Sequence, residues 1–284
     1  MAVVGHCVHD VLGVRVLEPA PFVKQAEIAQ KYRIQLDAMT KLHDTVVSMM
    51  TAGEWKVQKT RGVNPLVAQT MMGLLTKAMK TFRSIQILCE RGLYDDASAL
   101  ARVLLETTVA IAFILRKKSK QRMLMYHAHG MVQSVKMLNE WAKTKGLKRK
   151  ATKAMMKQAN DGLATYMSKL PAGTNLKRHW SGLGSIQEAM SQLRGGDAMY
   201  ATLYRYTSAI SHASDFGGHF SIDDGGEMVW EVFPQVEGFE APSYVARQLL
   251  WQAAQRIDEK FGLGYAAALR PFQLTRAQMD AGQV

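Results

Sequence analysis

The sequence predicts an all-α protein, a multi-helix bundle of about seven or eight helices with a small β-hairpin near residues 220–233. Apolar residues recur with helical spacing in most windows of the chain. The 284 residues include just seven prolines, which would interrupt helices, and 18 methionines beside many alanines and leucines. With 48% hydrophobic and 21% charged residues, the composition is that of a folded protein and excludes a disordered chain.

The first two helices are marked by their ends. Residues 21–50 are predicted to be helical, and a polar loop follows up to Asn64. Asn64 and Pro65 are an N-cap followed by a proline at the first helical position, so a second helix should begin there. This helix should run to Arg91 and stop at Gly92, which suits a left-handed C-cap.

The next helix is predicted from its charges and its apolar run. Aspartates 95–96 begin it and basic residues 116–118 end it, so both ends complement the helix dipole. The stretch 97–115 is apolar but contains Arg102 and Glu106, which favours a buried helix over a membrane span.

The remaining predicted elements are helices at about 120–145, 147–169, 184–194, 197–213 and 242–261, and a hairpin around the Asp-Asp-Gly-Gly turn at 223–226. We divide the chain into an N-terminal arm with the first helix (1–64), a main helical domain (65–263) and a loosely attached C-terminal tail (264–284). A basic helical hairpin, 116–157, is inserted into the main domain or packed on it. We expect one structural domain overall.

The positive charge of the chain is concentrated in one segment. The chain has 36 Lys and Arg against 24 Asp and Glu, a net charge of +12. Residues 116–157 hold 13 of the basic residues and one acid, Glu140, which leaves 23 basic and 23 acidic residues elsewhere. This basic block is a candidate surface for phosphates, and the alternative is a solvated hairpin whose lysines only keep the protein soluble. The residues predicted to contact nucleic acid, RNA rather than DNA, are Lys117, Lys118, Lys120, Arg122, Lys143, Lys145, Lys148, Arg149, Lys150 and Lys153. An acidic protein partner and an anionic membrane surface are the other anionic partners considered.

The segment Tyr204–His212 contains the candidate catalytic pair, Arg205 and His212. Seven residues apart on a helix, they lie about 20° from alignment and roughly 10 Å apart, and Tyr204, Ser208 and His212 form a second stripe. An arginine binds phosphate through its fork of donors, and a histidine exchanges protons near neutral pH. Together they could cleave RNA without a metal. The alternative is a chance spacing, with His212 a hydrogen-bonded interior residue.

Arg102 and Glu106 are spaced i, i+4 on the apolar helix. We favour an internal salt bridge that fixes helix packing. The alternative places the pair beside Arg205 and His212, where Glu106 could orient one of them.

No cofactor and no metal are expected. Residues 6–10 include two His, a Cys and an Asp, but these lie too close together for a zinc pattern. His127 and His129 would point about 200° apart on a helix, which disfavours joint coordination. The chain has no phosphate-binding loop, no HExxH, no dinucleotide fingerprint and no nucleophile elbow, so four large enzyme classes become improbable.

Two cysteines, Cys7 and Cys89, cannot form a disulfide framework and suit a reducing compartment. The first residues carry no basic start and make a poor signal peptide. A cytoplasmic location is therefore expected.

Three segments resemble a bacterial, all-helical family, domain-of-unknown-function family 5677. They are RSIQILCERGLYDDASALARVLLE (83–106), RHWSGLGSIQEAM (178–190) and YATLYRYTSAISHAS (200–214). The family pairs an Arg-x-x-x-Glu helix with a Trp-Ser-Gly and a Tyr-x-x-x-Ser-x-x-x-His helix. The residues at those positions are Arg102, Glu106, Trp180, Ser181, Gly182, Tyr204, Ser208 and His212.

The layout is also similar to the HEPN superfamily of helical nucleases and nucleotide-binding modules. That resemblance implies a homodimeric, metal-independent endoribonuclease of a toxin–antitoxin or phage-defence system, with Arg205 on the scissile phosphate and His212 as general acid or base. The chain departs from the pattern at Tyr206, where a polar residue usually follows the Arg. The competing hypothesis is a non-catalytic module that binds nucleic acid or an acidic partner, in which Arg102, Glu106 and His212 form a structural network.

Overall fold

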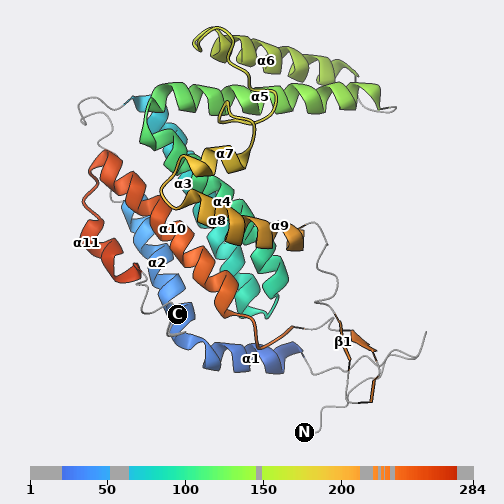
Figure 1. Ribbon diagram of the computed structural model, residues 1–284, viewed down its shortest axis with the longest axis vertical. Helices are drawn as coiled ribbons and strands as arrows, with labels where there is room; N and C mark the ends of the chain where they lie inside the picture. Colours follow the sequence, from blue (N-terminus) through green and yellow to red (C-terminus); the bar gives the residue numbers. More distant parts are fainter. Residues whose placement is uncertain are drawn as a thin grey trace. The chain divides into compact units, whose positions relative to one another are not determined.

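The computed structural model is predominantly helical, which confirms the all-α fold class (Figure 1). It describes residues 21–51, 64–144, 149–211, 220–222, 225–226, 228–230 and 234–273. These residues gather into two compact units. The first unit lies within residues 1–55, 75–108 and 201–284, and the second within 56–74 and 109–200. The expectation of one structural domain stays a prediction.

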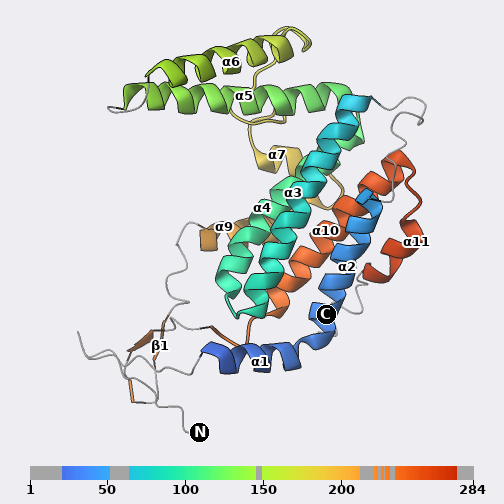
Figure 2. The ribbon, with the colours of Figure 1, turned by 180° about the vertical axis from the view of Figure 1, so that it is seen from behind.

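The first unit is built mainly from long helices. These are α1 (Pro21–Lys31), α2 (Arg33–Thr51), most of α3 (Pro65–Glu90), the first part of α4 (Tyr94–Arg116) and α10 (Glu240–Phe261). Helices α2 and α10 run beside each other in both views of the ribbon (Figures 1 and 2). Fully buried side chains such as Phe82, Leu104 and Leu250 form the core of this unit. The Thr108 hydroxyl, itself buried, lies 3.3 Å from the Leu249 carbonyl oxygen and links α4 to α10.

The ends of α3 agree with the sequence. The Asn64 side chain accepts a hydrogen bond from the Leu66 backbone N–H at 3.0 Å, which makes Asn64 the N-cap before Pro65. At the other end Gly92 has φ +73°, and the Leu93 N–H donates to the Leu88 carbonyl at 2.9 Å. A side chain at Gly92 would also meet the Gln235 backbone, because an ideal Cβ lies 2.5 Å from its carbonyl oxygen. The predicted left-handed cap is confirmed.

The described part of the chain contains more helices than the predicted seven or eight, so that number is wrong. The first predicted helix is divided at Tyr32 into α1 and α2. Tyr32 is buried and its ring stacks on Phe239 at 4.3 Å between centroids. Phe239 is far from Tyr32 in sequence, so local periodicity could not reveal this contact. The backbone N–H groups of Tyr32 and Leu36 still donate to the Ile28 and Tyr32 carbonyls at 2.9 Å, so the boundary at Tyr32 is a local distortion of the helix.

The C-terminal segment also differs from expectation. Residues beyond 264 include α11 (Ala266–Leu269) and a short 3₁₀ turn, η4 (Arg270–Phe272). Leu269 is buried, and its carbonyl accepts a hydrogen bond from the Trp251 indole N–H at 3.1 Å. The Tyr265 hydroxyl donates to the Ser48 carbonyl at 3.0 Å. This part of the tail is therefore docked, and the prediction of loose attachment is wrong for it.

Two short strands lie in the segment where the sequence predicts a hairpin. Strand β1 (Phe220–Ile222) pairs antiparallel with β2 (Met228–Trp230), and Ser221 lies opposite Val229. They form a two-stranded sheet of six residues and do not change the all-α fold class.

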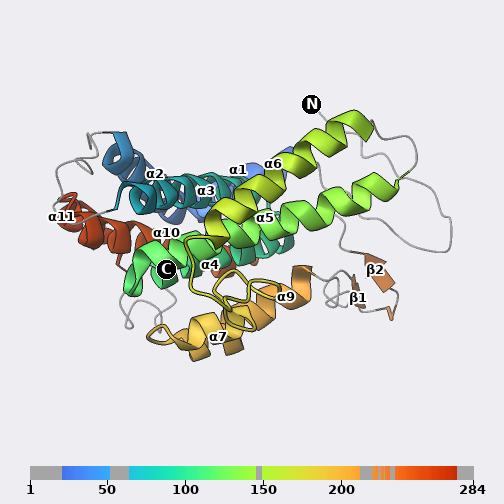
Figure 3. The same cartoon turned by 90° about the horizontal axis from the view of Figure 1, so that it is seen from above.

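The second unit contains a long helical hairpin and two short helices. Helices α5 (Ser119–Lys143) and α6 (Arg149–Met167) run side by side, as the view from above shows (Figure 3). Gly162 permits their close approach, because an ideal Cβ there would lie 3.2 Å from the Met131 sulfur. The short helices are α7 (Ile186–Ser191) and α8 (Gly196–Met199).

Helix α4 is the one described helix long and apolar enough to cross a membrane. Of its most apolar 18-residue window, 67% is buried within the protein. Cys89, near the end of α3, is also buried. Because burial disfavours the charged thiolate, the pKa of this thiol is raised to about 12.

Candidate functional site

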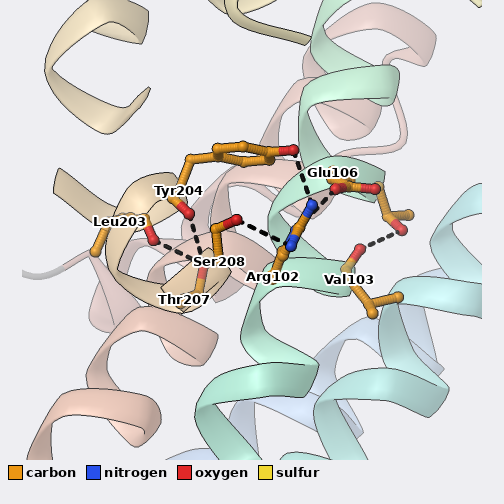
Figure 4. A network of polar contacts seen from close by, with 8 residues as sticks. Arg102, Val103, Glu106, Leu203, Tyr204, Thr207 and Ser208 are labelled. Carbon is orange, nitrogen blue, oxygen red and sulfur yellow. Dashed lines mark hydrogen bonds and ion pairs between the residues drawn. The ribbon is translucent and has the colours of Figure 1, made fainter. Parts of the chain in front are cut away.

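The candidate site of the first unit is a polar network around Arg102 (Figure 4). Its guanidinium donates from Nε to Glu106 Oε1 at 3.3 Å and from one terminal nitrogen to the Ser208 hydroxyl at 3.1 Å. The other terminal nitrogen donates to the Tyr204 hydroxyl at 3.0 Å. One arginine on α4 thus binds two side chains that lie about a hundred residues later in the sequence.

Tyr204 and Ser208 reach Arg102 because they are one helical turn apart. Tyr204 ends a π-helical turn, η2 (Tyr200–Tyr204), and Ser208 lies in α9 (Arg205–Ser211). The Tyr204 ring also lies 4.9 Å from the Arg102 guanidinium carbon, a cation–π contact. Single π-helical turns are rare in proteins, and those that occur are often found at functional sites. The hydrogen bonds of Tyr204 and Ser208 with Arg102 hold the start of α9 against α4.

Thr207 supports the same turn from inside the protein. It is buried, and its hydroxyl donates to the Leu203 carbonyl at 2.7 Å and lies 3.3 Å from the Tyr204 carbonyl oxygen. These contacts satisfy carbonyl groups near the junction of η2 and α9.

Burial divides the network into an inner and an outer part. The Arg102 side chain is 19% exposed and the Glu106 side chain 44% exposed. The predicted i, i+4 ion pair is present, but its carboxylate faces solvent in part. Its own electrostatic contribution is therefore small, about 0.3–0.5 kcal/mol for a pair of this kind.

The two predicted catalytic residues have different outcomes. Arg205 is exposed and is the first residue of α9, between the two α9-side partners of Arg102. His212 lies outside the described residues, so its distance from Arg205 stays a prediction. The arginine that binds Glu106, Tyr204 and Ser208 is Arg102.

The basic block of the second unit is not uniform. Lys145 and Lys148 lie outside the described residues, and Arg149 and Lys150 are described as the first residues of α6 without their side chains. The Lys143 ammonium is 2.8 Å from the Glu140 carboxylate, with both side chains exposed. The other exposed lysines predicted to contact nucleic acid are Lys117, Lys118, Lys120 and Lys153.

Arg122 differs from these lysines, because the protein itself binds its guanidinium. Its guanidinium donates to the Phe113 carbonyl and, at 3.2 Å, to the Gln192 side chain. The guanidinium carbon also lies 3.8 Å from the centroid of the Phe113 ring. Burial lowers the pKa of Arg122. These donors are turned to the fold, and the predicted contact of Arg122 with nucleic acid stays a prediction.

Two further side chains of α5, seven and fourteen residues after Arg122, also contact backbone carbonyls of the protein. The His129 Nδ1 donates to the Leu176 carbonyl at 2.8 Å, and the Lys136 ammonium lies 3.3 Å from the Lys177 carbonyl oxygen. Sequence reasoning missed this basic stripe. The i, i+7, i+14 spacing of Arg122, His129 and Lys136 was the signal that they share one helix face.

The Trp180-Ser181-Gly182 motif forms a turn in the second unit. The Ser181 hydroxyl accepts from the Leu183 N–H at 3.2 Å and lies 2.7 Å from His179 Nδ1, which also accepts from the Ser181 N–H. Burial lowers the pKa of His179 to about 4, and the nearby His129 adds to this effect. Gly182 has φ +74°, and an ideal Cβ there would collide with the Met125 methyl group. The motif is explained by local packing.

One of the comparisons with known proteins gives a family for this chain. Neither the comparison with curated proteins nor that with solved structures gives a significant match. Residues 69–228 match the model of DUF5677, a family of unknown function, and this segment contains Arg102, Glu106, Trp180, Tyr204 and Ser208. Because the match covers more than half of the 284 residues, the chain belongs to the DUF5677 family.

Proposed function

We propose that the protein is a metal-independent endoribonuclease, similar to HEPN ribonucleases, of a toxin or phage-defence system. Arg205 binds the scissile phosphate and His212 transfers the proton. The observation that carries the proposal is the exposure of Arg205 at the start of α9, next to the two side chains that Arg102 holds.

The proposed role of the network is to position Arg205. Tyr204 precedes it directly and Ser208 follows one turn later, and both are hydrogen-bonded to Arg102. A helix held on both sides of an exposed arginine loses little conformational freedom when that arginine binds an anion. Arg102 is then a positioning residue, because it acts through the helix that carries Arg205.

The proposed reaction needs one base, one acid and a stabilised phosphate. His212 takes the proton from the ribose 2′-hydroxyl, and the 2′-oxygen attacks phosphorus while the bond to the 5′-oxygen breaks. His212 of a second copy returns a proton to that leaving oxygen, which is why we propose a homodimer. Arg205 stabilises the negative charge that develops on the phosphate. The exposed lysines of the basic block, Lys117, Lys118, Lys120 and Lys153, attract the RNA in the cytoplasm.

The proposal is tested with purified protein, a labelled single-stranded RNA and excess EDTA. We expect cleavage by the native chain and a loss of at least about a hundredfold in Arg205→Ala and His212→Ala. Arg33→Ala is the matched control, since Arg33 is also exposed and also the first residue of a helix. No cleavage by the native chain, or equal cleavage by His212→Ala, would refute the proposal.

A second candidate is a non-catalytic module that binds RNA or an acidic protein through the basic block. It is favoured by the Arg102 network itself, in which three donors of the guanidinium bind acceptors of the protein. This candidate predicts that His212→Ala binds RNA as tightly as the native chain and that affinity falls steeply with salt. Filter binding at several salt concentrations, done beside the cleavage assay, separates the two functions.

A further inference from the structure

The second unit contains a pocket that is separate from the Arg102 network in sequence and in composition. Its volume is about 360 Å³, within the range of small-molecule sites. The lining comes from the first turns of α3 and from α5 and α6. The lining residues are Leu66, Gln69, Thr70, Gly73, Leu74, Met123, Tyr126, His127 and Tyr166.

Aromatic rings form one part of this lining. The His127 and Tyr166 rings are parallel within 10°, with centroids 5.4 Å apart, and the Tyr126 ring meets His127 edge-on. The His127 Nε2 lies 2.9 Å from the Thr70 hydroxyl, which donates its own proton to the Leu66 carbonyl. His127 must therefore donate from Nε2. Burial lowers the pKa of His127, so the ring is neutral at pH 7.

No lining residue carries a formal charge at neutral pH. Leu66, Leu74 and Met123 supply apolar surface, and Gln69 supplies an amide that can both donate and accept. This combination suits a flat, uncharged ring that has hydrogen-bonding groups on its edge. A phosphate or a carboxylate would lose its hydration there without gaining a cation.

Gly73 keeps the pocket open. It lies in the interior of α3, where glycine destabilises a helix relative to any ordinary residue. No positive φ requires a glycine there, and an ideal Cβ would meet nothing within 4 Å. Packing therefore gives no reason for this glycine, whereas a side chain at this position would enter the space that the pocket encloses.

Helical spacing puts a cation on the face of α5 that lines the pocket. Lys120 is exposed and precedes His127 by seven residues in α5. Two turns correspond to about 10 Å along the helix axis and nearly the same direction around it. A ligand with an uncharged ring in the pocket could extend a phosphate toward Lys120.

We propose that this pocket binds the base of a nucleotide, with the Gln69 amide at the edge of the base and Lys120 near its phosphate. Stacking on tyrosine rings accepts any base, because every base has a π-face. The base belongs either to a free nucleotide or to one unpaired position of a strand. The proposal goes beyond the ribonuclease function and does not depend on cleavage.

The test is isothermal titration of the full chain with AMP, CMP, GMP and UMP, and with ribose 5-phosphate as the probe that lacks a base. We expect saturable binding of at least one nucleotide and at least about tenfold weaker binding of ribose 5-phosphate. Equal binding of ribose 5-phosphate, or no binding of any nucleotide or of a nine-residue oligoadenylate, overturns the proposal.

A pair of matched variants tests the position of the site. Gly73→Leu fills the pocket, whereas Gly130→Leu adds the same side chain at another helical glycine that also has nothing within 4 Å and does not line the pocket. Both variants should keep or raise the Tm, since leucine is a better helix former than glycine. Gly73→Leu should lower nucleotide affinity at least about tenfold and Gly130→Leu should leave it unchanged. Native affinity in a folded Gly73→Leu protein overturns the proposal.

Two further measurements sharpen the ligand class. Lys120→Ala should lower the affinity for AMP but not for adenosine, because the Lys120 ammonium is proposed to lie near the phosphate. Competition between AMP and oligoadenylate identifies the source of the base. Displacement of bound AMP by oligoadenylate indicates a base within a strand, and the absence of displacement indicates a free nucleotide. RNA cleavage by Gly73→Leu is measured in parallel, so that loss of the pocket and loss of the ribonuclease are distinguished.

Discussion

Arg102 and Arg122 hold the fold together in different ways. Arg102, in the first unit, binds a carboxylate and two hydroxyl groups of side chains. Arg122, in the second unit, binds a backbone carbonyl, an amide side chain and the face of an aromatic ring. The partner of Arg102 four residues away, Glu106, can be recognised from the sequence. The carbonyl that binds Arg122 is brought close by tertiary packing and cannot be recognised in this way. The groups that the fold places around an arginine, more than the charge of the neighbouring sequence, decide whether its guanidinium can bind an anion.

The largest effect is expected for Arg102→Ala. This change removes the hydrogen bonds to Glu106, Tyr204 and Ser208 and leaves the Tyr204 and Ser208 hydroxyls without the Arg102 donors. We expect a loss of about 3 kcal/mol in the free energy of unfolding, measured by urea denaturation. Arg102→Lys keeps the positive charge but lacks the forked set of guanidinium donors, so it should recover about a third of the lost free energy of unfolding. A change below about 0.5 kcal/mol in Arg102→Ala would mean that the network does not stabilise α9.

Arg122→Ala should cost about 2 kcal/mol, because it removes two hydrogen bonds and the contact with the Phe113 ring. Lys120→Ala, at an exposed site two residues earlier, should change stability by less than about 0.5 kcal/mol. The two variants should differ in the opposite sense in RNA binding. Lys120→Ala should lower the slope of log RNA affinity against log salt concentration by about one, and Arg122→Ala should leave this slope unchanged. Equal slopes in both variants would contradict the division of the basic block into exposed and structural cations.

His179 should make the protein less stable as the pH falls. Its pKa is lowered from 6.5 to about 4 in the folded protein, so the unfolded chain takes up the proton first. The stabilisation is complete above pH 6.5 and is lost between pH 6.5 and about 4. Because the side chain is partly exposed, we expect a loss of about 1–2 kcal/mol. Urea denaturation at several pH values should show a shallower slope for His179→Gln in this window; an unchanged slope would exclude His179 as the cause.

The smallest effect is expected for Glu106→Gln. The carboxylate is 44% exposed and its pair with Arg102 measures 3.3 Å. We expect a loss below about 0.5 kcal/mol that disappears at 1 M salt. A loss above about 1 kcal/mol that persists in salt would show that Glu106, like Tyr204 and Ser208, belongs to the inner part of the network.

The sequence predicted the features whose causes are local. The cap at Asn64, the left-handed turn at Gly92 and the Arg102–Glu106 pair each depend on residues within five positions. It did not predict the boundary at Tyr32 or the stacking of this ring on Phe239, which is about two hundred residues away. The structural use of Arg122 was missed for the same reason.

The candidate site shows a similar division. Helical spacing correctly put Tyr204 and Ser208 on one stripe, and the family resemblance grouped them with Arg102 and Glu106. Spacing alone could not determine which arginine the stripe faces. Arg205 is closer in sequence, but Arg102 makes the contacts. The pocket at Gly73 has no sequence motif, because its lining comes from three helices that only the fold brings together.

The buried thiol of Cys89 has a chemical consequence. Oxidants and alkylating reagents attack the thiolate, and a pKa of about 12 leaves almost none of it at neutral pH. This cysteine should therefore survive oxidative stress unmodified while the end of α3 stays closed. The rate at which a thiol reagent labels Cys89 measures how often that helix end opens to water.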